Sequence, residues 1–203
     1  GLPGEERLNG KGVSACAVCD GFFFRGQDLV VVGGGDTAAE EASYLSKLAN
    51  KVYLLVRRDE MRASAIMQQR VERAENIEIL WNTETEKILG EEAVEGVRVV
   101  NNQTGEKSEI SAQGFFVAIG HKPNTDIFRG YLDMDENGYI ITKADSTQTN
   151  IPGVFASGDA QDHVYRQAIT AAGTGCMAAL EAERFLAAQE ANLVEGIPTI
   201  AMK

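Results

Sequence analysis

The sequence lacks the features that mark secreted and membrane-spanning proteins. Its longest apolar runs, residues 29–32 and 115–119, are far shorter than the roughly 20 residues of a membrane helix. It opens with a polar, Gly-containing stretch and has no basic end followed by an apolar segment, so we expect no secretory signal. Three cysteines are too few for a secreted disulfide framework. A cytoplasmic protein without a membrane partner is expected.

Basic residues are also scarce, with 19 Lys and Arg against 30 Asp and Glu and a net charge of -11. A general nucleic-acid binder needs a basic face, so no nucleic-acid partner is expected, although a local pocket for a small anion is compatible with this charge. The 203 residues are 44% hydrophobic and 24% charged, which is ordinary for a folded protein. This length suggests one domain, or one domain plus part of another.

Hydrophobic patterning indicates an α/β fold. Residues 28–32 and 52–56 are apolar strands, and between them a helical pattern begins at Asp36 and stops near Asn50. The apolar face of this helix holds Ala38, Ala42, Leu45 and Ala49. The charged residues predicted to point away from it are Glu40, Glu41 and Lys47. Such a strand–helix–strand unit has parallel strands and a right-handed crossover.

The remaining chain continues this pattern and then changes at residues 121–124, where we place a domain hinge. Before the hinge we expect a helix at 64–74, strands at 77–81 and 115–119, and antiparallel strands within 85–110 with a turn at 102–105. After it we expect loops, an extended segment at 138–141, a short strand at 154–156, and a long helix over 164–189. The stretch up to Gly26 is loop-like.

A glycine-rich turn follows the first apolar strand and opens the helix. Its sequence fits G-x-G-x-x-A and consists of Gly33, Gly34, Gly35, Asp36, Thr37 and Ala38. Gly33 makes the tight turn, Gly35 lets a pyrophosphate approach the backbone, and Ala38 lets the helix pack close to the strand. The helix N-terminus then favours the anion. The strand–helix–strand context favours dinucleotide binding over a purely structural turn.

Basic residues stand where a dinucleotide site specific for NAD places an acid. The second strand ends in Val56-Arg57-Arg58, and Arg62 adds a third guanidinium nearby. An acid about 20 residues after the glycine motif holds the ribose hydroxyls of NAD, whereas arginines suit the 2′-phosphate of NADPH. The pattern therefore predicts NADPH; the alternative is a solvated basic turn.

Cys16 and Cys19 form a C-x-x-C pair followed by Asp20. One thiol of such a pair attacks a disulfide and the second resolves the mixed disulfide, while Asp20 is placed to move protons. Half of a zinc site and a structural cysteine pair are the alternatives, but no second close pair of ligands exists, so no metal is expected. The other candidate ligands read as a core cysteine, Cys176, and two surface histidines, His121 and His163.

A nicotinamide site in the same chain as a redox dithiol suggests that a flavin passes electrons between them. Several motifs of the sequence resemble those of a known family of flavoproteins. They are C-A-V-C-D-G, G-G-G-D-T-A, R-R-D-E-M-R, F-V-A-I-G-H-K-P-N and the long segment from Gly158 through Leu186. Together they resemble the low-molecular-weight thioredoxin reductases over residues 1–186. A small departure is Val56, where the family commonly has His.

The resemblance implies an NADPH-dependent flavoprotein disulfide oxidoreductase. Cys19 would face the flavin, Cys16 would attack thioredoxin, and Asp20 would be the proton-transfer acid. The NADPH site would include Ile119 and Gly120 beside the glycine turn and the three arginines. Residues implied to contact FAD are Gly158, Asp159, Arg166, Gln167 and Ala168. The full-length protein would be a homodimer.

The resemblance also implies the domain plan. Residues 1–122 would be a Rossmann-like NADPH-binding domain that carries the dithiol, and residues 123–203 the C-terminal segment of an FAD-binding domain. The family's N-terminal FAD-binding segment, with its own glycine motif, is expected to be missing. Two other functions stay open: a nucleotide-binding module without turnover, and a sister flavoprotein that serves a peroxide-reducing partner.

Overall fold

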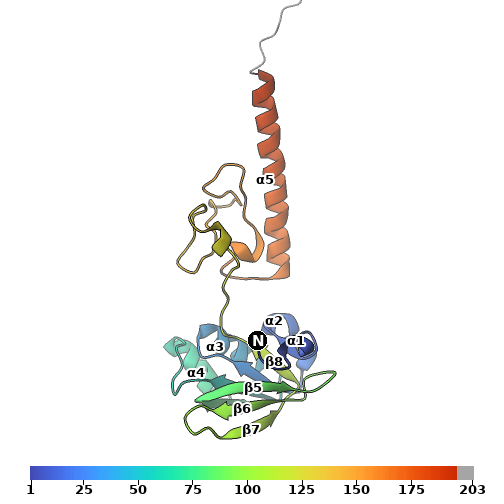
Figure 1. The fold of residues 1–203 in the computed structure, drawn as a ribbon, viewed down its shortest axis with the longest axis vertical. Coiled ribbons are helices and arrows are strands. Elements are labelled where there is room, and N and C mark those ends of the chain that lie inside the picture. Colours follow the sequence, from blue (N-terminus) through green and yellow to red (C-terminus); the bar gives the residue numbers. More distant parts are fainter. Residues whose placement is uncertain (196–203) are drawn as a thin grey trace, which may run out of the picture. The chain divides into compact units, whose positions relative to one another are not determined.

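The computed structural model describes residues 1–195, with side chains through residue 191. The chain divides into two compact units (Figure 1). Unit 1 covers residues 1–120 and unit 2 begins at His121.

A five-stranded sheet forms the centre of unit 1. Its order is β1–β8–β2–β3–β4, and every neighbouring pair is parallel. The strands are β1 (Val13–Ser14), β2 (Asp28–Val32), β3 (Lys51–Val56), β4 (Ile77–Trp81) and β8 (Gly114–Val117). The predicted parallel α/β arrangement is confirmed, because apolar runs of this kind are buried on both faces of a parallel sheet.

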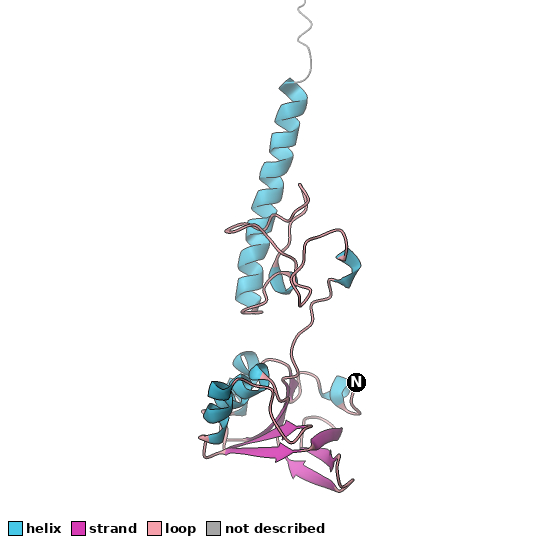
Figure 2. Cartoon of the chain, turned by 90° about the vertical axis from the view of Figure 1, so that its left-hand side faces the viewer, coloured by secondary structure: helices cyan, strands magenta, loops and turns pink. Residues whose placement is uncertain are grey.

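Two helices cover one face of this sheet (Figure 2). They are α3 (Asp36–Leu45) and α4 (Ala65–Glu72). Leu29 and Val31 of β2 point toward them and share a core with Ala38, Ala42 and Leu45 of α3. The alternation of side chains along a strand sends Val30 to the opposite face.

A three-stranded antiparallel sheet covers that opposite face. It contains β5 (Thr83–Leu89), β6 (Gly96–Asn101) and β7 (Lys107–Ser111). Val97 and Val99 of β6 pack with Val30 and Phe115 of the parallel sheet. Unit 1 thus has three layers, and the predicted antiparallel strands are confirmed, with the turn between β6 and β7 at residues 102–105.

Gly33 sits at the point where β2 turns into α3. Its φ of 149° is one that side chains rarely adopt, and a Cβ placed there would meet the Ala118 carbonyl oxygen at 2.4 Å and the Ala38 Cβ at 2.7 Å. Gly35 differs, because a Cβ there meets no atom within 4 Å. The first glycine therefore permits close packing, while the third leaves open space above the turn.

The loop-like expectation for the first 26 residues is wrong. This stretch forms α1 (Glu5–Leu8), β1, α2 (Ala17–Asp20) and the 3-10 turn η1 (Gly21–Phe24). Leu8 and Ala17 are buried and anchor it to the core. Elements of four residues or fewer are too short to show a hydrophobic period, so the sequence pattern does not reveal them.

Two predicted helix ends differ from the structure. Helix α3 ends at Leu45 rather than near Asn50, and tight turns follow it. Helix α5 (Ala168–Glu195) starts four residues later than predicted. The Asp162 carboxylate accepts hydrogen bonds from the backbone amides of Val164, Tyr165 and Arg166, at 2.8 to 3.0 Å, and Arg166 has φ 50°. This capped loop delays the helix.

Unit 2 consists of α5 and a loop-rich segment with the short turns η2 (Asp126–Phe128) and η3 (Gly158–Ala160). The strand predicted at 154–156 is wrong, since Phe155 makes only an isolated bridge with Gln148; Ile140 likewise makes only a bridge, with Met134. Within residues 1–195, no helix has an apolar stretch long enough to cross a membrane.

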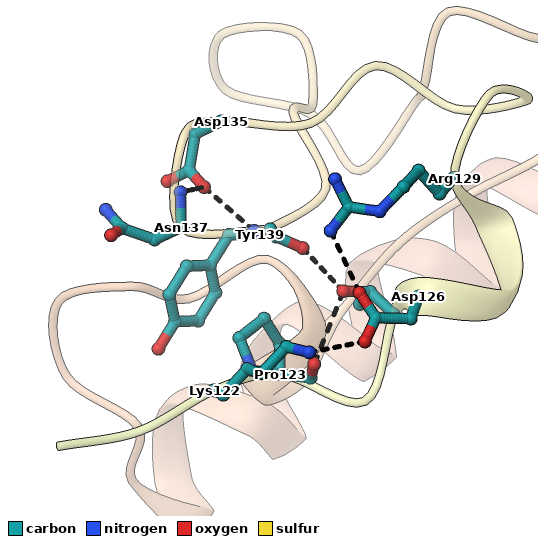
Figure 3. Close-up of polar contacts among 9 residues, drawn as sticks. Lys122, Pro123, Asp126, Arg129, Asp135, Asn137 and Tyr139 are labelled. Atoms are coloured by element: carbon teal, nitrogen blue, oxygen red, sulfur yellow. Dashed lines mark hydrogen bonds and ion pairs between the residues drawn. The ribbon is translucent and has the colours of Figure 1, made fainter. Parts of the chain in front are cut away.

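Side-chain hydrogen bonds replace sheet pairing at the start of unit 2 (Figure 3). Asp126 pairs with Lys122 and, at 2.9 Å, with Arg129. These two cations, Lys122 first, hold the pKa of Asp126 below its usual range. The Asp135 carboxylate accepts the backbone amides of Asn137 and Tyr139, both at 2.9 Å. These side-chain interactions therefore fix the backbone of the segment after residue 121, which has little regular secondary structure.

Replacing Gly33 with Ala is expected to lower the stability of unit 1 by about 1–3 kcal/mol, because the new Cβ enters a strained backbone position against a carbonyl oxygen. Urea unfolding followed by fluorescence of Trp81, the single tryptophan, measures this. Gly35→Ala is the matched control and should leave the unfolding midpoint nearly unchanged. Equal losses in both variants would contradict the packing role of Gly33.

Candidate functional site

Most of the predicted nucleotide residues line one cavity of about 520 Å³ in unit 1. Gly33, Gly34, Gly35 and Thr37 line it from the β2–α3 turn, and Ile119 and Gly120 line it from the chain that follows β8. The N-cap residue of α3 is Gly35, which makes no side-chain cap. The amides at the start of α3 are therefore available to an anion in the cavity.

Three arginines line the same cavity. Arg57 and Arg58 follow the end of β3, and Arg62 lies close to the glycine turn because its backbone amide donates to the Gly34 carbonyl at 2.6 Å. Glu60 and Glu84 also line this cavity, so its lining contains acidic as well as basic side chains. The pairing of a helix N-terminus with three guanidinium groups fits a ligand that carries two separate phosphate groups.

Asp36 and Ala38 of the glycine motif do not line this cavity. The Asp36 carboxylate accepts the Ser64 backbone amide and hydroxyl, both at 2.8 Å, which lowers its pKa. Ala38 is buried under Gly33. Both residues thus shape the turn: one ties the loop before α4 to α3, and the other sets the distance between helix and sheet.

The cysteine pair lies at the start of α2 as a disulfide with a Cα–Cα distance of 5.3 Å. Cys16 is the N-cap residue and its sulfur accepts the Cys19 amide at 3.2 Å. Cys16 is half-buried, whereas Cys19 is exposed. Asp20, the predicted proton-transfer acid, is half-buried at the end of the same turn. Within residues 1–195, no group of three or more metal-binding side chains gathers around the pair.

Ser14 supports the disulfide and was missed by sequence reasoning. Its hydroxyl oxygen accepts the Cys16 amide at 3.0 Å, and Ser14 itself pairs with Phe116 in the sheet. The disulfide is therefore tied to the edge of the parallel sheet. A serine two residues before a cysteine is too common to signal this role.

Glu41 of α3 is the second missed residue, and its predicted outward orientation is wrong. The side chain is half-buried, and its Oε2 is buried with no hydrogen-bond partner among the described residues. Burial raises the pKa of Glu41 to about 7, although the Ala17 backbone amide acts in the opposite direction. The signal was present in the sequence, because position 41 lies three residues after Ala38 and therefore borders the apolar face.

Apolar side chains are exposed next to the disulfide. Val18 is 61% exposed, Phe22 61% and Phe23 75%, and we name these three residues the apolar rim. The Arg25 guanidinium lies 5.4 Å from the centre of the Phe22 ring. Grouped exposed aromatic residues of this kind mark a surface that contacts another molecule.

The residues predicted to contact a flavin lie together in unit 2. Gly158 has φ 63° and begins η3 with Asp159, while Arg166, Gln167 and Ala168 lead into α5. Although burial acts against it, hydrogen bonds from Tyr165, Arg166, Thr170 and Val164 hold the pKa of Asp162 low, so a charged acid braces this loop. A left-handed turn and a carboxylate before a helix start fit part of a dinucleotide site.

The expectation that Cys176 is a core residue is wrong, because this cysteine of α5 is exposed. Gly173 and Gly175 of the same helix make no close contact, because a Cβ at either position meets no atom within 4 Å beyond the helix itself. His121 and His163 are exposed, as predicted.

The chain matches the model of the pyridine nucleotide-disulphide oxidoreductase family over residues 1–175. It is 59% identical over 188 residues to a thioredoxin reductase of Dictyostelium discoideum and 55% identical over 188 residues to one of Streptomyces clavuligerus. These matches cover 92% and 93% of this chain but 59% and 58% of the relatives.

Solved structures give the same result. The thioredoxin reductase from Giardia duodenalis matches with a TM-score of 0.84 and 46% identity, over 92% of this chain and 62% of that one. The enzyme from Streptococcus pyogenes MGAS5005 matches with a TM-score of 0.87 and 41% identity, over 93% and 61%. The chain thus spans about three-fifths of the length of the relatives it matches.

The Glu41 carboxyl gives a pH-dependent stability with a defined sign. Its pKa is about 7 in the folded chain against an ordinary value of 4.5, so its stabilising contribution is complete below pH 4.5 and is lost as pH rises through 7. Glu41→Gln removes this loss. The variant should be more stable than the wild type at pH 8 by about 1–2 kcal/mol, after allowing for solvent screening, and about equal at pH 5.

Urea unfolding at the two pH values, again followed by Trp81, measures the difference. Glu72→Gln is the control, since Glu72 is an exposed acid on α4 and its removal changes the net charge equally. A Glu41→Gln effect that is the same at pH 5 and pH 8 would show that Glu41 does not titrate in this range.

Proposed function

The chain belongs to the pyridine nucleotide-disulphide oxidoreductase family, and from this we propose that it carries the nucleotide-binding and dithiol parts of a thioredoxin-disulfide reductase. The observation that carries the proposal is that unit 1 contains two features together. One is a disulfide beside the apolar rim, and the other is a cavity lined by a glycine turn and three arginines. The similarity to thioredoxin reductases at 55 to 59% identity supports thioredoxin as the partner.

The proposed reaction of this chain is dithiol–disulfide exchange. A thiolate of the reduced pair, Cys16 by resemblance, attacks a sulfur of oxidised thioredoxin and forms a mixed disulfide. Cys19 then attacks Cys16, so the chain regains its disulfide and thioredoxin leaves with two thiols. Asp20 is the group proposed to exchange protons with the departing thiolate. The apolar rim gives the partner a surface to pack on while the sulfurs react.

NADPH is the proposed nucleotide. The amides at the start of α3 would hold its pyrophosphate above Gly35, and Arg57, Arg58 and Arg62 would hold its 2′-phosphate. When bound, NADPH and FAD supply the two electrons that reduce the Cys16–Cys19 disulfide. Asp36 and Ala38 serve this site by shaping the turn rather than by contact with the ligand.

FAD is the proposed second cofactor, with part of its site in unit 2. Gly158 and Asp159 would approach the chain that links flavin and ribose, and the flavin would lie near Arg166, Gln167 and Ala168. We accordingly assign residues 1–122 to an NADPH domain and residues 123–203 to part of an FAD domain. A cytoplasmic homodimer is proposed on the same resemblance, and exposed apolar side chains on α5, such as Ile169 and Leu186, suit further contacts.

The choice of nucleotide can be tested at the arginines. Replacing Arg57 and Arg58 with Gln should raise the NADPH dissociation constant roughly tenfold to a hundredfold and change that of NADH much less, since only NADPH carries the 2′-phosphate. Arg73→Gln is the control, because Arg73 is exposed and outside the cavity lining. Isothermal titration with both nucleotides gives the values, and equal weakening of both would reject the NADPH assignment.

The exchange reaction can be tested without either cofactor. The chain, reduced chemically and freed of reductant, should convert oxidised thioredoxin to its dithiol, as measured by intact mass after alkylation. Cys19→Ser should stop this release and accumulate the mixed disulfide while NADPH binding is unchanged. Cys176→Ser, which alters the exposed cysteine of α5, should react like the wild type. Release of reduced thioredoxin by the Cys19 variant would reject the scheme.

A further inference from the structure

Helix α2, which carries the disulfide, rests on α3. Ala17 is buried in the same core cluster as Ala38, Ala42 and Leu45. At the other end of α2, a Cβ on Gly21 would lie 2.7 Å from the Leu45 side chain. The two helices therefore meet through small residues, and whatever α3 presents at this contact lies against the helix that carries the redox pair.

Glu41 is the ionisable residue that α3 presents there. Its carboxyl interacts with the backbone amide of Ala17, the residue bonded directly to Cys16. Its Oε2 is buried and has no hydrogen-bond partner among the described residues. A carboxylate in this position is poorly screened by water, so it acts strongly on charges that form nearby.

The surrounding charges do not neutralise Glu41. Glu40, its neighbour on α3, repels it. The charged side chains of the elements packed against α3 are Asp20 on α2, Asp28 on β2, Lys51 on β3, and Arg70 and Glu72 on α4, with Arg25 following η1. In the described part of the chain, none of these pairs with Glu41, and the ion pairs present lie elsewhere. Its negative charge is thus left to act on the adjacent cysteine pair.

We propose that Glu41 is a positioning residue for the dithiol. Its charged carboxylate, against α2, opposes thiolate formation in the reduced Cys16–Cys19 pair, and protonation of Glu41 removes that opposition. The inference rests on the proposed function, because it concerns the reduced form of the same pair. Thiolate, not thiol, is the attacking species. When Glu41 is charged, it raises the pKa of the Cys16–Cys19 thiols and so lowers the fraction of thiolate. When Glu41 is neutral, this effect is absent and the thiol pKa is lower. Since Glu41 titrates near pH 7, the coupling acts in the neutral range.

The test measures how fast the reduced pair reacts with iodoacetamide between pH 5 and pH 10. All chains carry Cys176→Ser, so that only Cys16 and Cys19 react. Glu41→Gln should move the midpoint of the rate profile to lower pH and raise the rate at pH 7.5 roughly threefold to tenfold. Glu72→Gln, which removes an exposed acid of α4, should leave the midpoint where it is in the parent chain. A lost structural contact would change the plateau rate at high pH, not the midpoint.

An unchanged midpoint in Glu41→Gln would overturn the inference, and so would a midpoint moved to higher pH. Glu41→Met provides a second neutral side chain of similar size, and the two variants should agree if charge is the cause. Trp81 fluorescence and NADPH binding verify the fold of each variant. This test and the proposed function can fail separately. The proposed function is tested by the exchange of the parent chain with oxidised thioredoxin, which is measured independently of the iodoacetamide profile.

Discussion

The close approach of α3 to the parallel sheet is the contact on which the site of unit 1 depends. Gly33 gives the chain room to pass the Ala118 carbonyl, and Ala38 fills the space beneath it. A side chain at position 33 or a larger one at position 38 would lift the helix from the strand. The N-terminus of α3 would then no longer point into the cavity, and its middle would no longer support α2.

Helix α3 therefore serves both halves of the proposed chemistry. Its first turn faces the nucleotide cavity, and its second and third turns hold the disulfide helix through Glu41, Ala42 and Leu45. Small residues are frequent in this helix, which packs against the sheet, α2 and α4. An ionisable residue at such a packed surface, as at position 41, is partly shielded from water, so its charge acts more strongly on neighbouring groups.

The sequence was sufficient to predict the parallel strands, the antiparallel strands, and the glycine turn and arginines that line one cavity, but not Leu2, Thr83 or Glu84 in the same lining. Strand runs such as 28–32 and the glycine turn are local patterns that packing reinforces. The α2 turn and the role of Ser14 were not predicted, since they come from contacts between segments that short periodic patterns do not encode. Glu41 was assigned to the outer face of its helix, although its spacing from Ala38 places it at the border of the apolar face. The start of α5 was misplaced because one carboxylate, Asp162, holds three backbone amides out of the helix. In unit 2, isolated bridges stand where a short strand at 154–156 was predicted.

The pairing of β1 with β8 sets how unit 1 is connected to the rest of a polypeptide. Val13 lies opposite Phe115 and Ser14 opposite Phe116, so the first and the last strand of the parallel sheet are neighbours at one edge. The chain also enters and leaves this unit at adjoining places, since Gly1 lines one pocket with Val117 and Leu2 lines another with Gly120. A body built in this way can be inserted in the middle of a host domain at little cost in loop-closure entropy, because the host sees only two ends that are already side by side. Such an insertion leaves both cores free to fold around their own residues.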